Sequence, residues 1–339
     1  MVSERGLAVL RAIVEDYVAT REPVGSKGIV ERHAFGVSAA TIRHDMALLE
    51  EEELIQAPHT SSGRIPTDKG YRAFVDQLSD IRPLTLAQRH IIETFLGEAR
   101  DLDTLLARTV RLVAQLTNQL AVVQYPTFSH ARVHHLDLIL LAPTLVVCVL
   151  ISDSGQVEQR RIEPDEPITD DVLASLRERL NEQVTGCTMA EAAAELSSSP
   201  PIDPRHFSLV QSLAATLGEQ ATVSQGERLM VAGAANLVRT EQDFAGSILG
   251  IIEAIEEQVV LLKLFSEMAT DGDGVVVRIG HENAPFGLGE ASIVSTGFGV
   301  PGRDTSRLGI IGPTRMDYSG GMAAVRAVAR HVSRTLSEG

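Results

Sequence analysis

The sequence is poor in cysteine, has no long uninterrupted apolar run and carries no excess of positive charge. Its two cysteines, Cys148 and Cys187, are too few for a disulfide framework or for a zinc site made of four thiolates. The most apolar stretch, residues 136–151, is shorter than a membrane span of roughly 20 residues and contains Asp137 and Pro143. The net charge of −15 excludes a protein that coats nucleic acid through general positive charge.

A signal peptide is also lacking. The opening residues, MVSERGLAVLRAIVEDY, place acidic side chains among the apolar ones and contain no long apolar core. Without a leader or a membrane span, we expect a soluble cytoplasmic protein that has no membrane partner. A chain of 339 residues that is 44% hydrophobic favours two or three globular domains.

The common catalytic and metal-binding motifs are missing as well. Residues 297–302 match G-x-G-x-x-G, but they lead to another strand and not to a helix that could hold a pyrophosphate. Residues 271–274 lack the further acids of a calcium loop. His130, His134 and His135 have no cysteine or carboxylate to complete a metal site. We therefore expect no metal, no cofactor and no enzymatic activity.

Residues 1–80 predict three short helices, a β-hairpin and a fourth helix. Apolar residues recur at helical spacing in the first of them, and Ser26, Ser38 and Thr67 are suited to cap the other three. Between the third and fourth helices, residues 54–66 read as two short strands around a polar turn. This order is the plan of a winged helix, which is a helix-turn-helix with an appended β-ribbon.

The third predicted helix has the features of a DNA-reading helix. Small residues at its start allow close approach, and its outward face carries donors for base edges or phosphates. The hairpin tip adds hydroxyls, backbone N–H groups and a cation. The candidate DNA contacts are Ser38, Ala40, Thr41, Arg43, His44, Thr60, Ser61, Ser62, Gly63, Arg64, Lys69 and Arg72.

The net charge of this region argues against DNA binding. Residues 1–78 contain 9 Lys and Arg against 12 Asp and Glu, a net of −3. Most of the excess acid lies in residues 50–53, at the end of the third helix that is farther from its reading start. A basic face must therefore be local, and a winged helix that binds another protein stays open as the alternative.

The rest of the chain predicts an α+β multidomain protein. Strands are expected at 134–141, 145–152 and 157–162, and helices from 168 to about 217. Later strands are expected at 228–232, 259–265, 275–279, 291–296 and 308–311, with a helix near 248–258 and a C-terminal helix from 319. We divide the chain into residues 1–80, an α/β domain made of 85–167 and 273–339, and a mostly helical insertion at 168–272. Three consecutive domains would fit the same order.

A second candidate site follows the strand at 308–311. Arg315, Asp317 and Tyr318 crowd together at the strand end, where ligand or interface contacts often gather. A loop network that satisfies its own polar groups is the plainer interpretation.

Five stretches carry a resemblance to a known family. They occur in the family's order and near both ends of the chain: PVGSK (23–27), VSAATIRHDMALLE (37–50), PHTSSGRIPTDKGYR (58–72), IGHEN (279–283) and GIIGPTRMDY (309–318). The chain resembles the heat-inducible transcription repressors of the HrcA family over essentially its whole length. Residues 165–270 match only in general character.

The resemblance implies a fold and a function. The fold would be an N-terminal winged helix, a GAF-like α/β domain and a dimerisation domain inserted into it, with reading helix 39–50 and wing 58–66. The protein would be a homodimer that binds the double-stranded, inverted-repeat CIRCE operator upstream of chaperone operons, and a GroEL-type chaperonin would keep it active. The family commonly has asparagine at His44 and glycine near Glu53. A rival function is a sensor whose GAF-like domain binds a small ligand near Arg315.

Overall fold

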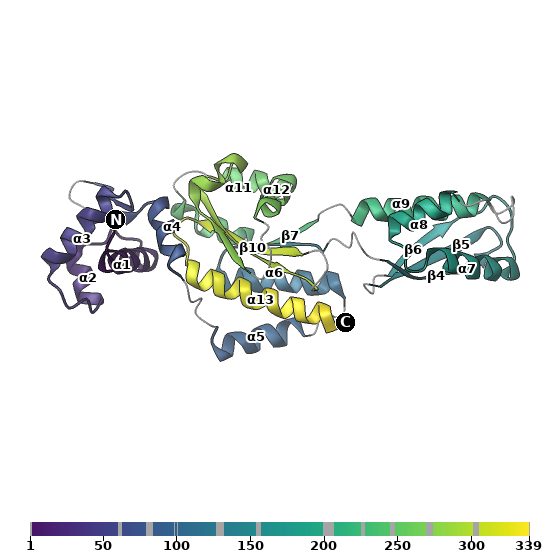
Figure 1. The fold of residues 1–339 in the computed structure, drawn as a ribbon, viewed down its shortest axis with the longest axis horizontal. Coiled ribbons are helices and arrows are strands. Elements are labelled where there is room, and N and C mark those ends of the chain that lie inside the picture. The colour runs from purple at the N-terminus through teal and green to yellow at the C-terminus, as the bar shows by residue number, and fades with distance from the viewer. Residues whose placement is uncertain are drawn as a thin grey trace. The chain divides into compact units, whose positions relative to one another are not determined.

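The computed structural model of the chain is shown in Figure 1. It forms two compact units: unit 1 comprises 1–125, 228–298 and 306–335, and unit 2 comprises 126–227 with 299–305 and 336–339. The residues that the structure describes are 2–59, 63–78, 84–97, 99, 101–126, 132–153, 157–198, 207–224, 228–244, 248–268, 274–300 and 305–338.

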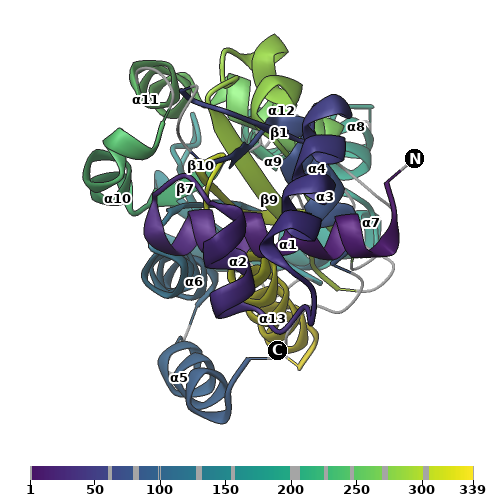
Figure 2. The ribbon, with the colours of Figure 1, turned by 90° about the vertical axis from the view of Figure 1, so that its left-hand side faces the viewer.

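The N-terminal part of unit 1 has the predicted order of elements. Helices α1 (Glu4–Thr20), α2 (Ser26–Arg32) and α3 (Ala39–Glu51) precede the antiparallel pair β1 (Ile55–Gln56) and β2 (Ile65–Pro66), and α4 (Asp68–Asp76) follows. Ser38 and Thr67 accept hydrogen bonds from the backbone N–H groups of Thr41 and Gly70, so these two predicted caps are present. The predicted cap at Ser26 is wrong, because Ser26 is the first residue of α2 and Gly25 stands at the cap position without a side-chain hydrogen bond. Figure 2 faces this helical end.

The three N-terminal helices enclose a small apolar core. Leu10 and Ile13 of α1, Ile29 of α2 and Ile42 and Leu49 of α3 are all fully buried. Their spacing of three, four or seven residues within each helix gives one inward stripe and leaves the opposite face of α3 to solvent.

A five-stranded antiparallel sheet forms the centre of unit 1, in the order β7-β3-β10-β9-β8. Its middle strands are buried at every position because helices cover both faces. The strands are β3 (Leu120–Gln124), β7 (Leu229–Ala232), β8 (Val275–Arg278), β9 (Ala291–Phe298) and β10 (Ser306–Pro313).

Different helices cover the two faces of this sheet. One face packs against α11 (Leu249–Glu256) and α12 (Val259–Glu267), whose apolar residues join those of β3 and β9 in one core. The other face is covered by α6 (Leu102–Thr117) and α13 (Tyr318–Glu338), and α5 (Leu86–Leu96) lies alongside α13 in Figures 1 and 2. Short helices α10 (Ala234–Arg239), η2 (Glu241–Asp243) and η3 (Gly280–Phe286) fill the connections.

Unit 2 is a three-stranded antiparallel sheet with helices packed on it. The strands β4 (Val133–Ala142), β5 (Leu145–Ser152) and β6 (Val157–Ile162) pair in chain order. Helices α7 (Asp170–Val184), α8 (Met189–Ser198) and α9 (Phe207–Ser224) bury their apolar stripes against alternate residues of the strands.

The limits of the two units differ from the predicted division of this part of the chain into an α/β domain of 85–167 and 273–339 and an insertion of 168–272. Residues 133–162 pack with the helices of unit 2, whereas 228–268 complete unit 1, where β7 pairs with β3 and α11 and α12 cover the sheet. The strand-to-helix transition near 168 therefore falls inside a unit. The reason is that β4–β6 pair only with one another and bury their apolar side on α7–α9.

Two elements differ from the expectation. Residues 259–265 were expected to be a strand, but they lie in α12, where Leu261, Leu264 and Phe265 face the core at helical spacing. A short run that is apolar except for Lys263 does not distinguish a strand from a helix. The strand β3, at residues 120–124, was not among the expected strands. No helix within the described residues is long and apolar enough to cross a membrane.

Candidate nucleic-acid interface

The outward face of α3 carries small side chains at its start and basic side chains in its middle. Ser38 and Ala40 are exposed at the beginning of the helix, and Thr41 is half-buried there. Arg43 and His44 follow on the exposed side, and neither makes a side-chain hydrogen bond or ion pair with any residue that the structure describes. This face therefore presents two free donors above a backbone that a partner can approach closely.

An ion pair between a buried carboxylate and a half-exposed guanidinium fixes the opposite side of α3. The carboxylate of Asp45 is 2% exposed and accepts from Nε of Arg5 at 2.8 Å and from its Nη2 at 3.0 Å. The hydrogen bond and the charge of Asp45 raise the pKa of Arg5. A two-point guanidinium–carboxylate contact restricts rotation of both groups, so it sets the angle of α3 on α1.

A second acid fixes α2 on α1 in the same manner. Asp16, which is 8% exposed, accepts from Nε and Nη2 of Arg32 at 3.0 and 2.8 Å. Its other oxygen lies 3.0 Å from Nε2 of His33. Sequence analysis did not identify Asp16 or Asp45 as functional residues, because a single acid in an amphipathic helix gives no sign that a distant arginine will meet it.

The hairpin is fastened to the chain between α1 and α2. The backbone groups of Val24 and Arg64 exchange two hydrogen bonds of 2.9 Å. Gly63 lies so close to this segment that a Cβ atom would be 2.6 Å from the carbonyl oxygen of Pro23. The predicted tip residues Thr60, Ser61 and Ser62 lie outside the described residues.

Arg64 has a structural partner in addition to its predicted role. Its Nε and Nη2 lie 3.0 and 2.9 Å from Oε2 of Glu50, so the guanidinium joins the hairpin to the end of α3. Lys69 is 56% exposed and stands 3.5 Å from Glu53, a contact too exposed to restrain it much. The cation of Lys69 therefore stays accessible beside the hairpin, whereas that of Arg64 is already engaged.

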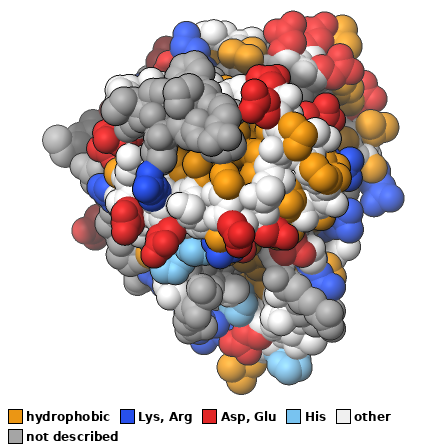
Figure 3. Space-filling model, turned by 90° about the vertical axis from the view of Figure 1, so that its right-hand side faces the viewer, with side chains coloured by type: hydrophobic (Ala, Val, Ile, Leu, Met, Phe, Trp, Pro, Cys, Tyr) orange, Lys and Arg blue, Asp and Glu red, His pale blue; other side chains and the backbone are white. Residues whose placement is uncertain are grey.

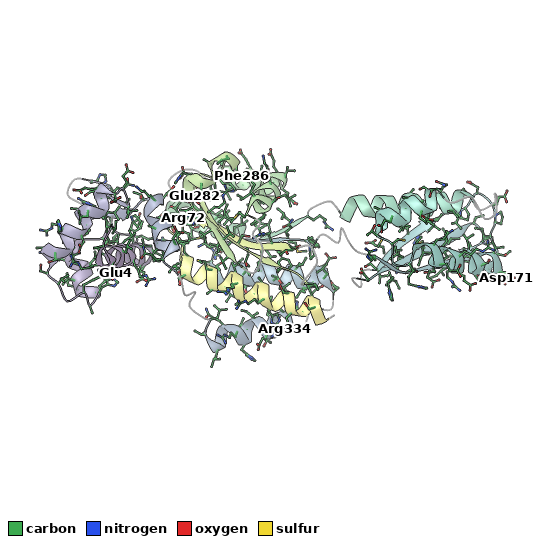
Figure 4. The ribbon with its side chains drawn as sticks, viewed as in Figure 1. Glu4, Arg72, Asp171, Glu282, Phe286 and Arg334 are labelled. Atoms are coloured by element: carbon green, nitrogen blue, oxygen red, sulfur yellow. The ribbon has the colours of Figure 1, made fainter. Side chains whose placement is uncertain are left out.

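Arg72 does not join the exposed basic face. Its Nε donates to Oε1 of Glu282 at 2.9 Å, and its Nη2 donates to Oε2 of Glu282 and, at 2.7 Å, to the carbonyl oxygen of Val277. Figure 4 labels Arg72 and Glu282 on facing elements. Arg72 therefore serves to dock α4 on the sheet, and its contact with DNA stays a prediction.

The same η3 segment holds the start of α4. The backbone N–H and Nδ1 of His281 each lie 3.0 Å from Oδ2 of Asp68. The stretches 58–72 and 279–283, which both carry the resemblance, therefore meet in space. Sequence analysis identified both stretches but gave no sign that they touch.

The second candidate site is an internal contact region. Tyr318 is 1% exposed, donates to Oγ of Ser292 at 2.7 Å and packs its ring 5.7 Å from that of Tyr71. Arg315 pairs with Asp243 and lies over the ring of Tyr17. Burial raises the pKa of both Tyr71 and Tyr318 well above the usual range.

Asp317 has a separate, local role. It is exposed and caps α13 by accepting from the backbone N–H of Gly320 at 3.0 Å. With Tyr318 in the core and Arg315 paired, these three residues do not line an open ligand pocket. These internal contacts agree with the plainer interpretation of a local network, and the interface and ligand interpretations stay predictions.

No group of histidine, cysteine and carboxylate residues capable of holding a metal ion occurs in the described part of the chain. His134 and His135 are exposed neighbours on β4, and His130 lies outside the described residues.

Comparison with known proteins identifies the family. The family model named "HrcA protein C terminal domain" matches residues 103–322. The heat-inducible transcription repressor HrcA of Clavibacter michiganensis subsp. michiganensis is 62% identical over 339 residues, and that of Leifsonia xyli subsp. xyli is 59% identical; each alignment covers 100% of both chains.

A solved structure of similar fold is also known. The crystal structure of a hypothetical protein matches with a TM-score of 0.68 at 23% identity, covering 100% of this chain and 99% of that one. This likeness supports the fold of a mixed α+β protein. The family, in contrast, is shown by the full-length relatives and the family model: the chain belongs to the HrcA family of heat-inducible transcription repressors.

Proposed function

We propose that this chain represses chaperone operons by binding an inverted-repeat operator of the CIRCE type through α3 and the hairpin. The observation that carries the proposal is the free pair Arg43 and His44 on the outward face of a helix whose inward face is fixed by Asp45. A rigid helix with unengaged donors loses little conformational freedom when it enters a major groove. In this account α1–α4 with β1 and β2 form the winged helix.

Each proposed contact has a chemical role. Arg43 would donate two hydrogen bonds to a guanine edge, and His44 would donate to a base or a phosphate. Ser38, Ala40 and Thr41 allow close approach at the helix start. Residues 60–63 and Lys69 would contact the backbone of the duplex. Arg64 would support the hairpin from Glu50.

The repressor is proposed to act as a homodimer, because an inverted repeat presents two equal half-sites to a two-fold symmetric protein. Unit 2 offers exposed apolar side chains that a second copy could cover: Ile139, Leu141 and Val157 are 44%, 58% and 55% exposed. Figure 3 faces this end of the molecule and shows hydrophobic side chains near its middle. The sheet of unit 1 with α6 and α11–α13 would be the GAF-like domain.

A GroEL-type chaperonin is proposed as the activity partner in the cytoplasm. Unfolded clients that occupy the chaperonin on heating would then release repression. Purified chain assayed on operator DNA at several temperatures, with and without chaperonin, tests this step. If chaperonin leaves operator binding unchanged at every temperature, the proposed role of the chaperonin is wrong.

The DNA-binding proposal is tested by a salt titration on two duplexes, the inverted repeat and a scrambled sequence of equal length. We expect tighter binding to the inverted repeat and a steep fall in affinity on both as salt rises, because each neutralised phosphate releases counterions. Equal affinity for the two duplexes, or an affinity that salt does not change, would contradict the proposal.

A further inference from the structure

A cavity of about 430 Å³ lies between α5 and the C-terminal half of α13, within unit 1. None of its lining residues belongs to the N-terminal helices or to the hairpin. Its walls include Ile92 of α5 and Ala323 of α13, so part of the surface is apolar. The volume falls in the range of small-molecule sites.

The polar part of the lining is almost entirely cationic. Arg89 comes from α5, and Arg326, Arg330 and Arg334 come from α13; the single carboxylate is that of Glu93. Four arginines against one glutamate give the lining a formal charge of +3, in a chain whose net charge is −15. The sequence has no acidic residue from 318 to 337, although acids are frequent elsewhere.

Helix periodicity explains how the arginines come to share one side. Arg326, Arg330 and Arg334 are spaced by four residues, so they form one stripe along α13. Val325, Val328 and Val332 lie on another side of the helix and are buried in unit 1. Figure 4 shows Arg334 on the side of α13 that faces α5. Like charges at this spacing repel one another and destabilise a helix. The sequence has no acidic residue between 318 and 337 that could offset this repulsion.

The guanidinium groups are largely unengaged. Arg89, Arg326 and Arg330 have no side-chain hydrogen bond or ion pair with any residue in the described part of the chain, and the Nε of Arg326 is buried without a partner. Arg334 donates to Nδ1 of His331 at 2.9 Å, which leaves its other N–H groups available. Several converging donors without acceptors favour an anion as the missing partner.

The dimensions point to more than one phosphate. The stripe from Arg326 to Arg334 extends over about 12 Å of helix, which is longer than a single phosphate and matches a chain of phosphates with an attached sugar. Guanidinium groups also stack on planar rings, and the apolar wall can receive a base. We propose that this cavity binds a small molecule with two or more phosphate groups and a planar ring, in the class of nucleoside di- and triphosphates.

Isothermal titration calorimetry of the full chain with ATP, in EDTA so that no divalent cation neutralises the phosphates, tests the proposal. Tripolyphosphate and adenosine are the two partial probes. We expect ATP to bind, tripolyphosphate to bind more weakly and adenosine not to bind measurably. The Arg326→Gln/Arg330→Gln double variant should raise the Kd for ATP by about tenfold or more.

Two further variants keep this result interpretable. Arg160→Gln/Arg161→Gln removes the same charge from exposed positions on β6 and should leave the Kd for ATP unchanged. Arg330→Gln alone changes an exposed side chain and should weaken ATP binding without lowering the melting temperature, since it also relieves the repulsion along the stripe. The proposal is wrong if ATP at millimolar concentration does not bind. It is also wrong if the cavity variants bind ATP with the Kd of the wild type, or if the Arg160→Gln/Arg161→Gln control loses as much affinity as they do. Duplex DNA that displaces ATP would reassign the cavity to nucleic acid.

Discussion

Arg72 and Glu282 are separated by 210 residues in the sequence, yet Nε of Arg72 donates to Oε1 of Glu282 at 2.9 Å. Burial of Arg72 lowers its pKa, but the hydrogen bonds and charge of Glu282, with a smaller contribution from Asp76, outweigh that effect and raise it. The contact of Tyr71 with Tyr318 lies beside this pair. The last helix of the proposed winged helix is therefore held on the sheet by specific polar contacts as well as by packing.

Replacement of Glu282 tests the weight of this ion pair. Glu282→Gln removes the charge that Arg72 and the backbone N–H of Ile279 both contact, so we expect the free energy of unfolding to fall by about 1–3 kcal/mol. Asp76→Asn is the matched control, because Asp76 faces the same arginine at 3.6 Å but is 63% exposed; its cost should stay below about 0.5 kcal/mol. If urea unfolding gives the same loss of unfolding free energy for both variants, the ion pair with Glu282 stabilises the fold no more than the exposed contact with Asp76.

The turn before the hairpin stores backbone strain. Glu53 has φ of 61°, in the left-handed region that favours glycine, whereas Glu51 is the last residue of α3 and keeps the right-handed helical conformation. Glu53→Gly should raise the free energy of unfolding by up to about 1 kcal/mol, because the left-handed conformation costs a side-chain-bearing residue about 1–2 kcal/mol. Glu51→Gly should lower it by about 1 kcal/mol. Thermal unfolding of both variants checks the opposite signs; a loss of stability in each would contradict the account.

The close approach at Gly63 predicts a large effect of a single methyl group. Gly63→Ala places Cβ within 2.6 Å of backbone atoms of Val24, which cannot move without breaking the two hydrogen bonds to Arg64. We expect a loss of about 1–3 kcal/mol in unfolding free energy and weaker operator binding. Gly36→Ala is no suitable control because its φ is positive; Gly25→Ala, where a Cβ meets open space, should change stability by less than about 1 kcal/mol.

The two cysteines should differ sharply in reactivity. Burial, with a smaller contribution from Asp137, raises the pKa of Cys148 from 9.0 to about 12. At pH 8 only about one thiol in ten thousand is then ionised, so iodoacetamide should modify the half-exposed Cys187 and leave Cys148 unmodified in the native protein. Mass spectrometry of the peptides decides this, and rapid labelling of Cys148 would show that its strand opens.

The same shift has a consequence for stability. The unfolded thiol loses its proton near pH 9 while the folded one keeps it to about pH 12, so the contribution of Cys148 is complete below pH 9 and is lost as pH rises. The Cys148→Ala variant should lack this part of the fall in unfolding free energy at alkaline pH. Unfolding measured between pH 8 and pH 11 checks this.

Local signals in the sequence were sufficient for the N-terminal elements. Ser38 and Thr67 cap the helices that their positions predict, and the stripe of Ile42, Met46 and Leu49 faces the core. The positive φ of Glu53 lies near the position where the resemblance implied glycine. In each case a neighbour within a few residues decides the structure.

Contacts between distant residues could not be inferred in that way. No pattern in the sequence joins Asp45 to Arg5 or Arg72 to Glu282, because each pair meets only after the helices have packed. The prediction of a strand at 259–265 failed for a related reason: the helical state of this mostly apolar segment is set by the sheet face that it covers. The unit boundaries likewise depend on which strands pair with one another.

The most direct test of the proposed function compares wild type and Arg43→Ala on two duplexes at one salt concentration, the inverted-repeat operator and a scrambled sequence. If Arg43 reads a guanine, the variant should lose about 1–3 kcal/mol on the operator and much less on the scrambled duplex. Arg160→Ala, an exposed arginine of unit 2, should change neither affinity. An Arg43→Ala variant that binds both duplexes as tightly as wild type would contradict the placement of α3 in the groove.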